Sequence, residues 1–183
     1  MNFDGELLIW IQSVCVNDFL TPFFKFITFL GNSGWIWIIL ALILMVFKKT
    51  RTIGIMVILA LIGSLIVNNI ALKNILMRAR PYEVVSGVER LISAPHDYSF
   101  PSGHSAASFS AAVATMKGIK RFDYKGAYTA LYYGVLILAI LIAFSRLYLG
   151  VHYPTDVAAG ILTGWIIGNL VWKIPIKNNE LKG

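Results

Sequence analysis

The sequence contains a single cysteine and few charged residues. With Cys15 alone, no disulfide can form within the chain. Charged side chains make up 14% of the 183 residues, whereas soluble domains have about 25%. Hydrophobic residues make up 57%, and the mean hydropathy is +0.71. This composition excludes an ordinary soluble domain and indicates an integral membrane protein.

Acidic residues are also scarce. Nine Asp and Glu face sixteen Lys and Arg, which gives a net charge of +7. Such an excess could favour binding to nucleic acid, but the basic residues cluster between long uncharged runs. These uncharged runs are 26–47, 52–72, 100–116, 126–145 and 157–172. Each run approaches the roughly 20 residues that a helix needs to cross a bilayer. Backbone in lipid must be helical, so we expect one all-α domain over 1–183: a polytopic bundle of about five transmembrane helices.

The basic clusters predict the orientation of these spans. With five alternating spans, all three clusters lie on one side of the membrane, which the positive-inside rule makes cytoplasmic. Weak contact with anionic lipid is a second interpretation of the excess. We therefore expect a multi-pass plasma-membrane protein with a cytoplasmic C-terminus. The clusters are Lys48, Lys49 and Arg51; Lys117, Lys120, Arg121 and Lys125; and Lys173, Lys177 and Lys182.

The N-terminal 25 residues do not read as a signal peptide, because they lack a basic start and Asp4 and Glu6 precede the apolar part. Apolar residues between Leu7 and Val14 predict an amphipathic helix lying in the outer interface. The polar residues Asn17, Asp18 and Lys25 argue against a further span through 7–30.

Unusual polar residues gather at the outer ends of the predicted spans. In "KNILMRARP", Lys73 and Arg80 are seven residues apart and would share a helix face if the helix continues. Pro81 would then end that element, because it biases the preceding residue out of helical geometry.

Two further segments complete this set. In "PSGH", Ser102 can cap a helix and Gly103 lets a ligand approach the backbone. Free N–H groups at such a helix start favour phosphate. In "SRLYLGVHYPTD", Pro154 would begin the last helix, so that Asp156 in its first turn can reach back to His152.

Each of these residues also has an ordinary interpretation. Lysine and arginine can anchor a span at the interface, Ser102 and His104 can cap or pack, and Asp156 can match the helix dipole. Three cations without balancing acids, Lys73, Arg80 and Arg146, nevertheless need an anion. Phosphate fits that requirement.

The three segments together resemble the tripartite signature of the type-2 phosphatidic acid phosphatases. These membrane lipid-phosphate phosphatases are related to bacterial acid phosphatases and vanadium haloperoxidases. The matching residues are Lys73, Arg80 and Pro81; Pro101, Ser102, Gly103 and His104; and Ser145, Arg146, His152 and Asp156. Many bacterial members have an additional N-terminal span, which this sequence does not predict.

The resemblance implies a role for each residue. His152 would be the nucleophile that forms a phospho-histidine, Asp156 would orient it, and His104 would be the general acid. The phosphoryl oxygens would be held by Lys73, Arg80, Ser102, Gly103 and Arg146. No metal or other cofactor is implied, and the partner is a lipid phosphate in the bilayer, with the site on the outer face.

Undecaprenyl pyrophosphate is the substrate that the resemblance favours. Phosphatidylglycerol phosphate or phosphatidate is the alternative, and a lipid phosphotransferase would use the same intermediate. A non-enzymatic membrane scaffold or transporter remains a further alternative. A vanadate-dependent peroxidase is opposed by the five apolar runs. The loop residues Glu83, Glu89, His96, Asp97 and Tyr98 are expected to be solvated, or else to form a lid or head-group selector.

Overall fold

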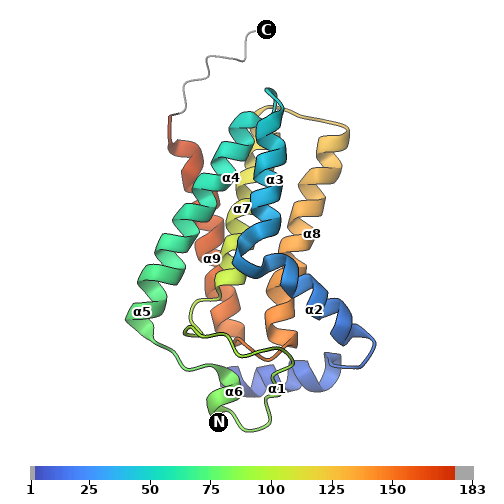
Figure 1. Cartoon of the computed structure of the whole chain (residues 1–183), viewed down its shortest axis with the longest axis vertical. Coiled ribbons are helices and arrows are strands. Elements are labelled where there is room, and N and C mark those ends of the chain that lie inside the picture. Colours follow the sequence, from blue (N-terminus) through green and yellow to red (C-terminus); the bar gives the residue numbers. More distant parts are fainter. Residues whose placement is uncertain (1–2, 176–183) are drawn as a thin grey trace.

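The computed structural model describes residues 3–175, which form helices and connecting loops without a strand. Five helices run along the long axis of the molecule (Figure 1). They are α3 (Trp35–Val46), α4 (Arg51–Ser64), α7 (Gly103–Arg121), α8 (Ala127–Tyr148) and α9 (Pro154–Leu170), which is followed by the short helix η3 (Val171–Lys173). The predicted all-α bundle is confirmed.

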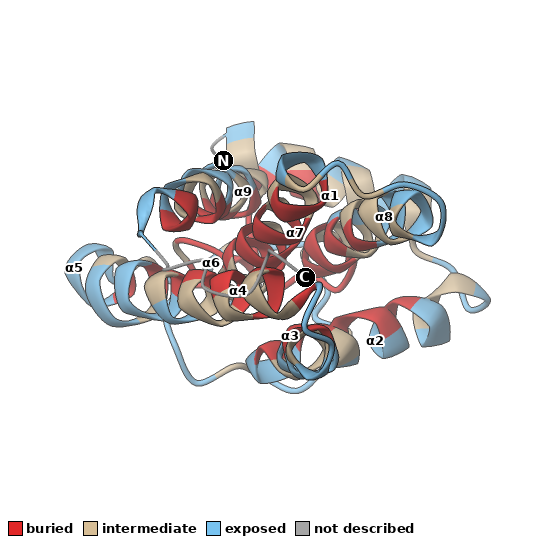
Figure 2. Ribbon diagram, turned by 90° about the horizontal axis from the view of Figure 1, so that it is seen from above, coloured by how far each residue is buried: buried red, intermediate tan, exposed pale blue. Residues whose placement is uncertain are grey.

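Four segments are long and apolar enough to cross a membrane: Leu20–Val46, Arg51–Val84, Ala127–Tyr148 and Pro154–Lys173. The fifth long helix, α7, lies in the centre of the bundle and is largely buried (Figure 2). It packs against α4, α8 and α9. Because α7 faces protein rather than lipid, it can be built from alanine and serine, and its apolar character is correspondingly weak.

Three glycines set the contact between α7 and α9. A Cβ atom at Gly160 would lie 2.6 Å from the carbonyl oxygen of Ser102, the residue before α7. A Cβ atom at Gly164 or Gly168 would lie 2.5 or 2.7 Å from a carbonyl oxygen of α7. These distances are far too short for a side chain, so only glycine lets the two backbones approach this closely. The glycine repeat therefore acts as a packing stripe, as its four-residue spacing predicts.

The first predicted span is not one helix. The run 26–47 is divided between α2 (Leu20–Gly31) and α3 by a short turn, η1 (Asn32–Gly34). Ser33 and Gly34 have φ values of 51° and 69°, which belong to the left-handed region. The sequence Asn-Ser-Gly favours such a turn, and the apolar length of the run conceals it. As a result, α2 leaves the bundle axis at an angle to α3 (Figure 1).

The second span also ends differently from the prediction. After α4 the helix widens into η2 (Leu65–Leu72), a π-helical segment, and continues as α5 (Lys73–Leu76). It ends at Met77, with φ of 41°, and Pro81 begins the short helix α6 (Pro81–Val84). Proline is well suited to a first helical position. The expectation that Lys73 and Arg80 share a face of one continuous helix was therefore wrong.

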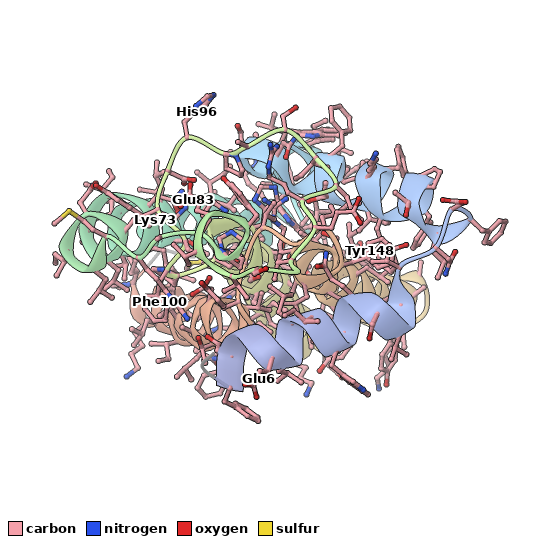
Figure 3. All side chains as sticks on the ribbon, turned by 90° about the horizontal axis from the view of Figure 1, so that it is seen from below. Glu6, Lys73, Glu83, His96, Phe100 and Tyr148 are labelled. Carbon is pink, nitrogen blue, oxygen red and sulfur yellow. The ribbon has the colours of Figure 1, made fainter. Side chains whose placement is uncertain are left out.

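A separate N-terminal helix, α1 (Phe3–Cys15), crosses one end of the bundle (Figures 1 and 3). It buries Gly5, Leu8 and Gln12 against the bundle. The Gln12 amide donates hydrogen bonds to the carbonyl oxygens of Glu89, at 2.8 Å, and Tyr148, at 3.2 Å. At 13 residues α1 is too short to span a bilayer, in agreement with the predicted amphipathic helix.

The loops that carry the basic clusters lie at the opposite end of the molecule from α1 (Figure 1). The Lys49 ammonium lies 4.7 Å from the ring centre of Tyr124, and the Lys117 ammonium donates to the Asn169 side chain at 3.1 Å. The described residues of the three clusters thus share one end, as predicted. Lys177 and Lys182 of the third cluster lie outside the described residues.

Candidate active site

The three motif segments meet at the end of the bundle that α1 crosses. Main-chain hydrogen bonds hold them together: Ser102 donates to the Asp156 carbonyl at 3.0 Å, and Ser99 donates to the Arg78 carbonyl at 2.8 Å. The first bond joins the starts of α7 and α9, and the second joins the loop before α7 to the chain after α5. These two bonds join residues that are 54 and 21 positions apart in the sequence.

His152 and Asp156 form a buried pair in the turn from α8 to α9. Nδ1 of His152 lies 3.4 Å from Oδ2 of Asp156, and the same oxygen accepts hydrogen bonds from the Ser99 hydroxyl at 2.5 Å and the Tyr153 amide at 2.9 Å. Nε2 of His152 lies 3.4 Å from Nη1 of Arg80. One ring nitrogen therefore faces the carboxylate, and the other faces the cations.

The surroundings of His152 favour a neutral imidazole. Burial, together with the positive charges of Arg146 and Arg80, lowers the pKa of His152 well below its usual range. A neutral ring next to a carboxylate places its proton on the nitrogen that faces the carboxylate. Nε2 is then left with a free lone pair directed toward the cationic side of the site.

Of the three predicted cations, Arg146 is the one that is buried without a carboxylate partner among residues 3–175. Its side chain is buried, with 2% of the residue exposed, and Nη1 donates to the hydroxyl of Thr28 on α2. Within residues 3–175 its Nε has no hydrogen-bond partner, and no carboxylate pairs with it. A buried guanidinium with an unsatisfied N–H is costly unless an anion binds there.

Lys73 and Arg80 are buried but already paired. Both contact the carboxylate of Asp97, with Nη2 of Arg80 at 2.5 Å from Oδ1. Arg80 also donates from Nη1 to the Val151 carbonyl, at 2.7 Å. Burial raises the pKa of Asp97, but the hydrogen bond and charge of Lys73 and the charge of Arg80 outweigh it, so the pKa is lowered overall.

The prediction of a solvated loop holds only in part for Asp97: its side chain is 49% exposed, but its carboxylate also contacts Lys73 and Arg80 in the site. It holds for His96, its neighbour, which points away from the bundle (Figure 3). Nothing in the sequence distinguishes these two neighbours, because the loop 85–102 has no periodic pattern that would give its conformation.

The "PSGH" segment forms the start of α7. Ser102 caps the helix: its hydroxyl accepts from the Ser105 amide at 3.4 Å and from the Ser105 hydroxyl at 2.9 Å. Ser102 is fully buried and does not line the cavity described below, so its predicted phosphate contact stays a prediction. Nε2 of His104 lies 3.0 Å from Oδ1 of Asn32, at the break between α2 and α3.

A cavity of about 620 Å³ joins these groups to the membrane-facing part of the bundle. Its polar end is lined by Lys73, Arg80, Arg146, His104 and His152, together with Gly103 and Asp97. Its other wall is apolar and comes from α3, α4 and η2, through Ile38, Ile58, Leu61, Ile62 and Leu65. A molecule with an anionic head and an apolar tail matches both parts.

Four contributors to this site are absent from the sequence prediction: Thr28, Asn32, Arg78 and Ser99. Thr28 contacts Arg146 from within α2, whereas Asn32, Arg78 and Ser99 contact predicted residues from a helix break or a loop. In residues 3–175 no three His, Cys, Asp or Glu side chains form a group suited to a metal ion.

Comparison with known proteins shows which family the chain resembles. An undecaprenyl-diphosphatase of Sulfolobus acidocaldarius is 33% identical over 141 residues, which cover 75% of this chain and 64% of that relative. The chain thus spans less than two thirds of that relative's length. The crystal structure of Aquifex aeolicus LpxE superposes with a TM-score of 0.79 and 30% identity, covering 95% of this chain and 97% of that one.

A second solved structure is a transmembrane PAP2-type phosphatidylglycerolphosphate phosphatase from Bacillus subtilis. It has a TM-score of 0.76 and 26% identity, and the match covers 96% of this chain and 87% of that one. Residues 53–180 match the PAP2 superfamily, a range that contains all three motif segments. With helical bundle, motif order and family match in agreement, the chain belongs to the PAP2 superfamily.

Proposed function

We propose that this protein is an integral membrane lipid-phosphate phosphatase that acts through a phospho-histidine intermediate. The observation that carries the proposal is the buried Arg146 guanidinium with its unpaired Nε, placed at the polar end of a cavity whose other wall is apolar. A phosphate group would satisfy the guanidinium, while an attached hydrocarbon chain would occupy the apolar part.

In the first step Nε2 of His152 would attack phosphorus, and the bond from phosphorus to the leaving oxygen would break. The leaving oxygen would take the electron pair and accept a proton from His104. Asp156 would hold the proton on Nδ1 and stabilise the charge that the ring acquires. Lys73, Arg80 and Arg146 would stabilise the charge on the phosphoryl oxygens.

In the second step water would attack the phospho-histidine. His104, now neutral, would accept a proton from that water, and the phosphorus–nitrogen bond would break with its electron pair returning to Nε2. Inorganic phosphate would leave. Every step uses groups that line or adjoin the cavity and calls on no metal ion.

For the substrate we propose undecaprenyl pyrophosphate. Three cations and one carboxylate, Asp97, line the head-group end of the cavity, so a net positive charge remains there. A pyrophosphate brings more negative charge to neutralise it than a monoester does. The relative from Sulfolobus acidocaldarius carries the name of that activity. Phosphatidylglycerol phosphate is the second candidate, favoured by the structural likeness to the Bacillus subtilis phosphatase.

Direct competition between these two lipids tests the proposal. With both present in mixed micelles and a chelator in the buffer, we expect the larger kcat/KM for undecaprenyl pyrophosphate. The His152→Ala variant, purified in the same way, controls for contaminating phosphatases. A larger kcat/KM for the glycerophospholipid would contradict the substrate. Labelled phosphate appearing in a second lipid, and not in solution, would indicate a phosphotransferase.

We also propose that the site opens on the outer face of the plasma membrane and that the C-terminus is cytoplasmic. The motifs lie at the end of the bundle opposite the basic loops, and the positive-inside rule places those loops in the cytoplasm.

Cysteine labelling of intact cells checks this orientation. In a Cys15→Ser background, an impermeant maleimide is expected to label Ser86→Cys, in the exposed loop after α6, but not Lys48→Cys, in the exposed loop between α3 and α4. Permeabilised cells should label at both positions. Labelling of Lys48→Cys alone in intact cells would reverse the topology.

A further inference from the structure

The Arg78 side chain, which the sequence did not predict as part of the site, contacts four other residues. Its Nη1 donates to Oδ1 of Asp156 at 2.6 Å and to the Thr155 hydroxyl at 2.8 Å, and its Nη2 donates to Oδ2 of Asp4 at 2.7 Å. The guanidinium carbon lies 3.8 Å from the ring centre of Tyr153. The planar group is thus fixed both along its edges and on its face.

The two carboxylate oxygens of Asp156 accept hydrogen bonds from different partners. Oδ2 accepts from Ser99 and the Tyr153 amide on the side of His152, whereas Oδ1 is bound by Arg78. Asp156 is fully buried, and a buried carboxylate needs a partner charge. Within the described part of the chain, Arg78 and His152 are the residues that form ion pairs with Asp156. With His152 neutral, Arg78 is the counterion.

Asp4 carries this contact to the N-terminal helix. Its Oδ1 accepts from the Thr155 amide at 3.1 Å, and its Oδ2 accepts from the Thr155 hydroxyl at 2.5 Å and from Arg78. The start of α1 is thereby attached to the start of α9 and to the counterion of Asp156. Arg78 itself does not line the cavity, so any effect it has on a bound phosphate passes through Asp156.

We propose that Arg78 is a positioning residue that holds Asp156 in place behind His152, and that Asp4 of α1 holds Arg78. The proposal rests on the proposed function, because it assigns Arg78 to the His152–Asp156 pair. It predicts that α1 covers the end of the bundle and also, through Asp4, helps to position the His152–Asp156 pair.

Kinetics of Arg78→Gln give the first test. We expect kcat to fall about 10- to 100-fold, which is within the cost of a misplaced reacting group. KM and the inhibition constant for inorganic phosphate should stay nearly unchanged. In an Asp156→Asn background the same substitution should have no further effect on kcat, because residues that act as one unit are not additive. Arg78→Lys should recover part of the loss. Asp4→Asn should act in the same direction more weakly, and Glu6→Gln, on the exposed side of α1, should have no effect.

Histidine NMR gives a second test that does not depend on turnover. The chain has three histidines, and the His152→Ala spectrum identifies the signal of His152. We expect wild-type His152 to carry its proton on Nδ1, and Arg78→Gln to show a mixture of the two tautomers.

Several results would overturn the proposal: unchanged kcat in Arg78→Gln, an equal loss of kcat in the Asp156→Asn background, or an unchanged His152 tautomer. Loss of inorganic phosphate binding in both Arg78→Gln and Arg78→Lys would also overturn it, because the contact would then maintain the fold as a whole. If the wild-type protein released no phosphate from any lipid while Arg78→Gln changed the tautomer, the proposed function would fail and the positioning role would stand.

Discussion

Replacement of His152 by alanine is expected to reduce phosphate release by about 10⁴-fold or more, the scale seen when hydrolases lose a nucleophile. Within residues 3–175, no other side chain at the polar end of the cavity is placed to replace Nε2 of His152, because Lys73 and Arg80 are paired with the Asp97 carboxylate and His104 is the proposed acid. Phosphate release from lipid by the purified variant measures the effect directly.

His96→Ala is the matched control, because it removes an imidazole that points away from the bundle. Its rate should equal that of the wild type. Thermal unfolding of both variants separates chemistry from folding, since the loss of the buried His152 ring is expected to cost about 1–3 kcal/mol of stability. Near-native turnover by a folded His152→Ala variant would show that the nucleophile is another group.

Replacement of His104 by glutamine is expected to slow lipid hydrolysis by about 10²- to 10⁴-fold, the usual contribution of a general acid. The loss should depend on the leaving group. A lipid alcohol or lipid phosphate needs the proton that His104 supplies, whereas p-nitrophenolate leaves readily without it. We therefore expect a much smaller loss with p-nitrophenyl phosphate, measured with the same enzyme preparation.

The contrast between the two substrates is the decisive readout for His104. A loss of equal size with both would indicate that His104 binds phosphate or supports the fold rather than donating a proton. Asn32→Ala serves as a companion variant, because it removes the Oδ1 atom that lies 3.0 Å from Nε2 of His104 while leaving the imidazole in place. It should show the same leaving-group dependence in weaker form.

The sequence was sufficient for the parts of the molecule that follow local rules. The apolar runs gave the long helices, and the spacing of His152 and Asp156 placed both within one turn at the start of α9. Each of these features depends on residues within a few positions of one another.

The remaining features depend on contacts between distant segments. Periodicity did not reveal the break at Asn32, because apolar residues continue on both sides of it. The helix end at Met77, four residues before Pro81, placed Arg80 in extended backbone, with φ of −79° and ψ of 152°. The roles of Asp97 and Arg78 arise only when the loop 85–102 and α1 fold over the end of the bundle.

The apolar wall of the cavity and the reacting groups come from different parts of the chain. Ile38, Ile58 and Leu61 belong to α3 and α4. His104, by contrast, lies in the first turn of α7, and His152 lies in the turn between α8 and α9. Substitutions in the wall can therefore accumulate without moving a proton donor or a nucleophile. A change of wall residue would thus alter the space that the cavity offers to an apolar tail and leave the proposed nucleophile and acid in place.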